Sequence, residues 1–97
     1  MTRFEELSLS DYFMHGGQVW VKTDDSDAKR IVTGTRHGFR GYDAVEPLVL
    51  HVEEEWRGLW LAVTDDYDGP GSPIGHGGTA QIALVELAET LEDLEAM

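Results

Sequence analysis

Histidines, serines and a run of aspartates are the residues of this sequence that could take part in chemistry. The four histidines show neither of the spacings typical of zinc sites, His-x-x-x-His and His-Glu-x-x-His. Ser26 and Ser72 both lie outside a Gly-x-Ser-x-Gly turn, which would expose a serine nucleophile. The chain has no cysteine, which excludes thiolate metal sites and cysteine catalysis. We therefore expect a protein that is not an enzyme and has no catalytic residue.

The aspartates at 65, 66 and 68 are followed by glycine, as in a calcium-binding loop. An EF-hand loop starting at Asp66 would place Gly77 where the bidentate acid belongs. A flexible polar loop is therefore the better interpretation, and we expect no metal ion and no cofactor. The glycines at 75, 77 and 78 precede a helix start, where exposed N–H groups could hold an anion or simply form a flexible entry.

Charge is distributed unevenly along the chain. The formal net charge is −12, and residues 53–97 hold eleven acidic residues against the single base Arg57. Such a field repels the phosphates of nucleic acids and attracts basic proteins, so we expect a basic protein partner and no direct nucleic-acid binding. The alternative is that the charge only keeps a small protein in solution.

The candidate partner-binding residues follow from this charge. Acids near the C-terminal end of a helix oppose the helix dipole, which suggests a role outside the domain, although a solvated face is the plain alternative. Trp20 alternates with Lys22 and is expected to be exposed, as tryptophans at interfaces often are, although a half-covered sheet face explains the pattern equally well. The predicted set is Glu86, Glu89, Glu92, Asp93, Glu95, Asp65, Asp66, Asp68, Glu53, Glu54, Glu55 and Trp20.

Strand signals dominate the first half of the chain. Gly16-Gly17 between two alternating segments predicts a β-hairpin, because glycine supplies the positive φ angles of a tight turn. Pro47 lies near the start of a later strand, 45–52. Because proline cannot donate a hydrogen bond to a neighbouring strand, this end of the strand is expected at an edge or a bulge. The elements expected are a turn-like lead at 4–9, strands at 11–15, 18–23 and 28–33, a polar turn at 24–27, a loop or broken edge strand at 34–41, and a strand at 45–52.

The second half ends in a helix. Residues 53–58 are expected to turn, and 59–63 to form a central strand because both of its faces are apolar. The glycines and prolines of 65–78 predict one long loop. From Thr79, the expected N-cap, alanines and leucines recur every three and four residues as far as Leu94.

Together these elements predict an α+β fold, a twisted and mostly antiparallel sheet of four to five strands with one C-terminal helix packed on it. The length predicts a single domain over 1–97 with one core. The sequence shows neither an apolar run long enough for a membrane span nor a secretion signal, so we expect a cytoplasmic protein. A homodimer is left open.

The stretch from Gly58-Leu59-Trp60 through Gly78-Thr79 to Leu87 and Leu91 resembles the HicB-like family. In that family a strand carrying an aromatic residue leads through a loop to Gly-x-Thr and a helix. The helix-turn-helix or ribbon with which such antitoxins bind operators is absent here. The resemblance therefore implies a strand-and-helix module that binds another protein.

The whole chain also looks like small proteins of phages and mobile elements. Our leading hypothesis is a phage or mobile-element protein that binds and inhibits a host protein through its acidic surface, in an anti-CRISPR-like or other anti-defence role. In one version of this hypothesis, the acidic surface imitates nucleic acid and occupies a basic groove of the host protein. The alternative is a HicB-like antitoxin that neutralises a small basic toxin.

Overall fold

The computed structural model describes residues 1–69 and 71–96. It divides the chain into two compact units, Met1–Val49 (unit 1) and Leu50–Met97 (unit 2). The expected α+β class is confirmed, with antiparallel strands and a C-terminal helix. Among the described residues the strands form two sheets, of six and three strands, where the sequence predicts one sheet of four to five. The single domain over 1–97 stays a prediction.

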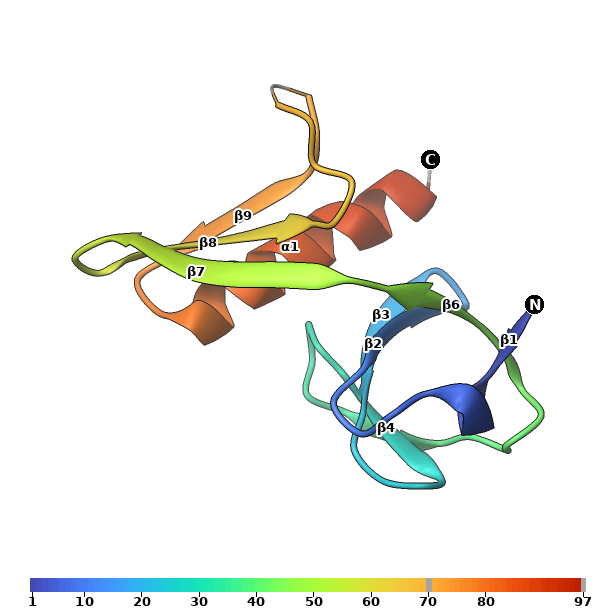
Figure 1. The fold of residues 1–97 in the computed structure, drawn as a ribbon. Helices are drawn as coiled ribbons and strands as arrows, with labels where there is room; N and C mark the ends of the chain where they lie inside the picture. Colours follow the sequence, from blue (N-terminus) through green and yellow to red (C-terminus); the bar gives the residue numbers. More distant parts are fainter. Residues whose placement is uncertain (70, 97) are drawn as a thin grey trace. The chain divides into compact units, whose positions relative to one another are not determined.

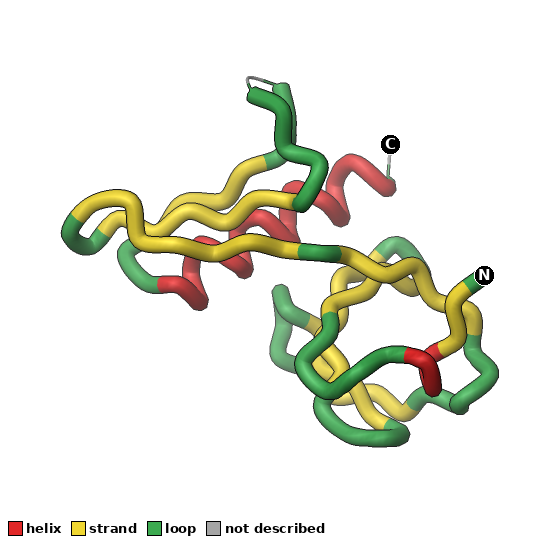
Figure 2. The backbone as a smooth tube through the Cα atoms, viewed as in Figure 1, coloured by secondary structure: helices red, strands yellow, loops and turns green. Residues whose placement is uncertain are grey.

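Unit 1 consists of one antiparallel sheet and a short 3₁₀ helix. Figures 1 and 2 show that its strands curl around the interior of the unit. The elements are β1 Thr2–Arg3, the 3₁₀ helix η1 Phe4–Glu6, β2 Tyr12–His15, β3 Gln18–Lys22, β4 Asp27–Arg30, β5 Arg36–Gly38 and β6 Ala44–Leu48. Across the sheet the order is β1-β6-β2-β3-β4-β5, so the segment predicted as a loop or broken edge strand contains the edge strand β5.

The predicted hairpin is confirmed by β2 and β3. Gly16 and Gly17 have φ angles of 61° and 76°, as a tight primed turn requires. The polar turn that follows is also present, because the Ser26 backbone N–H donates to Asp24 Oδ1 at 2.9 Å. This hydrogen bond holds the pKa of the Asp24 carboxyl below its ordinary value.

The core of unit 1 is aromatic and includes Trp20. Phe4 and Phe39 stack with ring centroids 5.0 Å apart, and Phe13 meets both rings edge-on. Trp20 is only 6% exposed and packs edge-on against Phe39. Its Nε1 donates to the carbonyl of His15 at 3.2 Å. The expectation that Trp20 is exposed is therefore wrong, because its face of β3 points into this core.

Lys22 shares that buried face and is 4% exposed. Its ammonium donates to the carbonyls of Phe4 and Leu7, at 3.0 and 2.8 Å, and lies 4.5 Å from the centre of the Phe4 ring. These bonds tie both ends of η1 to β3. They also take the place of the water molecules that an exposed ammonium group would bind.

The strand expected over 45–52 is two strands. β6 ends at Leu48 in unit 1, and β7 (Leu50–Trp56) begins the sheet of unit 2. Pro47 lies beyond the reach of β1, whose pairing with β6 stops at Val45, so this end of β6 is locally an edge. Glu53, Glu54 and Glu55 belong to β7 rather than to a turn, which is a second correction.

Unit 2 is a three-stranded antiparallel sheet covered on one face by a helix (Figure 1). Its elements are β7, β8 Leu59–Thr64, β9 Ile74–Gly77 and α1 Ala80–Glu95. The prediction that β8 is central is confirmed, because it pairs with both neighbours. Ala62 of β8 and Ala83 and Leu87 of α1 form the buried core, with Trp60 packed against it.

β9 is a strand where the sequence predicts only loop. Gly75 and Gly77 face α1 so closely that a Cβ on Gly75 would lie 2.1 Å from the Ala83 carbonyl oxygen and 2.5 Å from the Leu87 nitrogen. The glycines are there because the helix backbone leaves no space for a side chain, not because the chain is irregular. Pro70, part of the same predicted loop, lies outside the described residues.

The helix begins as predicted. Thr79 is the N-cap, and its Oγ1 accepts a hydrogen bond from the Ile82 N–H at 3.1 Å. Leu84 and Leu87 are buried, whereas Leu94 is 50% exposed, so the apolar stripe ends before the last turn.

Candidate binding surface on the three-stranded sheet

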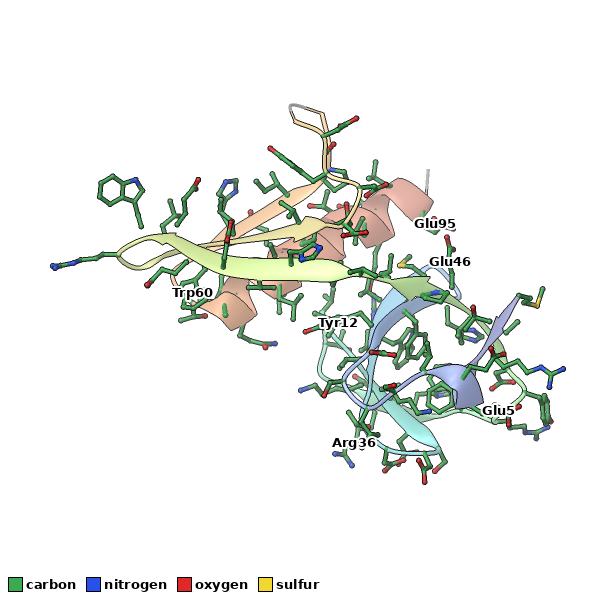
Figure 3. All side chains as sticks on the ribbon, in the orientation of Figure 1. Glu5, Tyr12, Arg36, Glu46, Trp60 and Glu95 are labelled. Atoms are coloured by element: carbon green, nitrogen blue, oxygen red, sulfur yellow. The ribbon has the colours of Figure 1, made fainter. Side chains whose placement is uncertain are left out.

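The two faces of the unit 2 sheet differ because side chains alternate along each strand. The face toward α1 carries the row Val52, Ala62 and Gly75. The opposite face, which we call the open face, carries two cross-strand rows. These are Glu53–Leu61–His76 and His51–Val63–Ile74. Figure 3 shows side chains projecting from both sides of this sheet.

The open face has an apolar centre. Leu61, Val63 and Ile74 are half-buried, and Tyr67, from the loop after β8, borders them with 42% of its surface exposed. Together with His51, Glu53 and Glu55 they line a shallow cavity of about 230 Å³. Pockets for small-molecule ligands usually measure about 300–1,000 Å³, so this cavity suits a single side chain better than a cofactor.

Carboxylates surround this apolar centre. Asp65 Oδ1 lies 2.8 Å from His51 Nε2, an ion pair whenever the imidazole is protonated. Glu53 and Glu55 are exposed, and neither has a hydrogen-bond or ion-pair partner in the described part of the chain. Glu54 differs from both, because it lies across from Trp60 and accepts a hydrogen bond from the Gly58 N–H at 3.4 Å.

A second group of carboxylates lies on α1, with Glu86, Glu89 and Asp93 on its outer side. Glu86, Glu89, Asp93 and Glu95 are exposed, while Glu92 is half-buried and has an interaction partner. Ile82 and Val85 are apolar residues on the same side, and with three polar neighbours they line a second shallow hollow of about 410 Å³. This side and the open face are opposite layers of unit 2.

The remaining loop carboxylates are occupied locally. Asp66 accepts a hydrogen bond from the Thr64 hydroxyl, and Asp68 accepts one from Ser72 at 2.7 Å. The predicted acidic residues are therefore brought together in two groups, one beside the open face and one on α1, and not in a single continuous surface. Trp20 belongs to neither group, since it is buried in unit 1.

Sequence reasoning missed the apolar centre of the open face. Residues 59–63 are apolar on both faces, which indicates that β8 is central but not which face the helix covers. The alternation of His51 and Glu53 with Leu50 and Val52 in β7 was the available signal. It marks the side of the sheet that faces away from the helix.

Of the histidines and serines that could do chemistry, His51 pairs with Asp65, and His15, His37, Ser26 and Ser72 have local partners in the described part of the chain. Among the described residues, no three histidine, aspartate or glutamate side chains come together as a metal site. His15 contacts the Ala44 carbonyl and His37 packs against Trp20. Ser26 and Ser72 hydrogen-bond to aspartates of their own turns.

No family model matches this sequence, and neither does any curated protein or solved structure. In the described part of the chain, α1 and η1 are both too short or too polar to cross a membrane.

Proposed function

We propose that this chain is a non-enzymatic protein that binds a basic partner protein through the acidic surface of unit 2. The observation that carries the proposal is the concentration of charge, with eleven acidic residues and only Arg57 as a base in residues 53–97. Six of those acids are exposed, and their side-chain carboxylates have no described partner: Glu53, Glu55, Glu86, Glu89, Asp93 and Glu95. Unpaired like charges repel one another, and a cationic surface relieves that repulsion.

The role we propose is inhibition of a host protein by a phage or mobile-element protein, with unit 2 taking the place of nucleic acid. Glu86, Glu89 and Asp93 lie one turn apart on α1, which gives about one charge per 5 Å of helix axis. One DNA strand carries about one charge per 3.4 Å, which is of the same order. A basic groove that holds a phosphate backbone is a suitable target for such a stripe.

Capture from a bacterial lysate with the immobilised chain tests the proposal, at about 50 mM and about 500 mM salt, where screening differs strongly. The variant neutralises four acids of unit 2: Glu53→Gln, Glu55→Gln, Glu86→Gln and Glu89→Gln. The matched control neutralises four acids of unit 1: Glu5→Gln, Glu6→Gln, Asp25→Asn and Glu46→Gln.

We expect one or more basic proteins to be captured at low salt by the unmodified chain and the control, and lost at high salt or with the unit 2 variant. Nucleic-acid-binding host proteins among them support the inhibitor role, and a small basic toxin supports the antitoxin alternative. If the captured proteins are the same at both salt concentrations and with the unit 2 variant, the proposal is refuted.

A further inference from the structure

The open face of unit 2 departs from the usual pattern of a two-layer unit. When a helix covers one face of an antiparallel sheet, the other face is normally polar because it contacts water. Here the central strand β8 presents Leu61 and Val63 to that side, and β9 adds Ile74. Contiguous apolar groups with polar residues around them are typical of interaction sites.

The cavity on this face limits what can bind there. Its volume of about 230 Å³ is below the range of pockets for small-molecule ligands, and its centre is apolar. Such a hollow accepts one large aliphatic or aromatic side chain. The ligand is therefore a segment of a macromolecule that contributes a single apolar anchor and makes its other contacts at the rim.

Charge decides which macromolecule fits. Glu53 lies directly across from Leu61 on the neighbouring strand, where Cβ atoms are about 5 Å apart, and Glu55 lines the same cavity. Since neither glutamate has a described partner, a cation next to the apolar anchor would reach both. A second copy of this chain fits badly, because it would bring two sets of unpaired glutamates together within units that are themselves strongly acidic.

We propose that the open face binds a basic amphipathic segment of the partner protein, which inserts one apolar side chain between Leu61, Val63 and Ile74 and pairs lysines or arginines with Glu53 and Glu55. This inference rests on the proposed function and adds to the acidic stripe of α1 an anchoring site on the sheet. The apolar anchor provides affinity, and the charges set orientation and the rate of association.

Two probe peptides test the proposal with the full chain. The first is a lysine-rich peptide with leucines three and four residues apart, and the second has serine at each leucine and the same charge. Binding is measured by fluorescence anisotropy at about 50 mM salt, where surface charges are weakly screened. We expect the leucine peptide to bind at least about tenfold more tightly, as the loss of a few buried methyl groups implies.

Paired variants locate the site. Val63→Thr with Ile74→Thr removes methyl groups from the open face and should weaken binding of the leucine peptide about tenfold. Glu53→Gln with Glu55→Gln should weaken it about fivefold at low salt and little at high salt. Each pair has a control, Val85→Thr with Ile82→Thr on α1 and Asp25→Asn with Glu46→Gln in unit 1, expected to change affinity less than about twofold. Circular dichroism verifies that every variant folds.

Three outcomes would overturn the inference. These are equal binding of the two peptides, a larger loss from the control pairs than from the open-face pairs, and no binding of the leucine peptide. Each leaves the proposed function standing as long as lysate capture still depends on the unit 2 acids. Loss of that dependence defeats the proposed function itself, so the two failures are distinguishable.

Discussion

Gly75 lies where α1 approaches the sheet most closely, so an alanine at this position measures how tightly the two layers of unit 2 are packed. The new Cβ would lie 2.1 Å from the Ala83 oxygen and 2.5 Å from the Leu87 nitrogen, both backbone atoms that cannot rotate away. Reaching ordinary contact distance requires α1 to move by more than about 1 Å, which weakens the contacts of the whole buried helix face.

Overpacking usually costs about 1–3 kcal/mol, and the backbone clash places Gly75→Ala at the upper end, about 3 kcal/mol. Gly78→Ala is the matched control. Its Cβ would meet only the Gly58 oxygen, at 3.8 Å, so we expect a change below about 1 kcal/mol, towards greater stability.

Urea unfolding followed by far-ultraviolet circular dichroism reports on α1, the one long helix of the described residues. A loss of about 3 kcal/mol lowers the midpoint by about 1–3 M, given the usual dependence of stability on urea. Equal midpoints for Gly75→Ala and Gly78→Ala would refute the packing of β9 against α1.

Three further substitutions test local features by urea unfolding, the first in unit 1 and the others in unit 2. Lys22→Met leaves two buried carbonyls without their charged donor and should cost about 2 kcal/mol, whereas Lys29→Met, on the neighbouring strand, should cost less than about 0.5 kcal/mol. Thr79→Ala removes the helix N-cap and should cost about 1 kcal/mol, while Thr79→Ser should change little. Glu95→Lys should stabilise α1 by about 0.5 kcal/mol, because the last turn has no basic residue; a loss of stability would contradict the dipole argument.

Local signals in the sequence predicted local structure correctly. The Gly16-Gly17 hairpin, the Thr79 N-cap and the central strand β8 depend on neighbouring residues, and the structure confirms all three. The α+β class follows from the same signals, since alternating strands followed by one helical period leave few other arrangements.

The errors lie where a distant contact decides the outcome. Gly75 and Gly77 suggest a loop when taken alone, but they are strand residues whose missing side chains let α1 approach. The passage from β6 to β7 at Val49 has no glycine or polar turn residue, and Pro47 lies within β6, so 45–52 looks like one strand. Trp20 was expected to be exposed because it shares a strand face with Lys22. Lys22 is itself buried, so this face points into the core and Trp20 is buried with it.

The position of the acidic residues also depends on a contact between distant parts of the chain. Charge can be counted from the sequence, but its division between the open face and the outer side of α1 depends on which sheet face the helix covers. That choice is made by the glycines of β9, which only become informative once the helix is placed.

Nuclear magnetic resonance of the isotope-labelled chain, titrated with the leucine peptide, tests the central claim most directly. Binding to the open face should shift the methyl signals of Leu61, Val63 and Ile74 and leave those of Ile82 and Val85 on α1 nearly unchanged. The reverse pattern, or shifts spread evenly over both layers of unit 2, would contradict it.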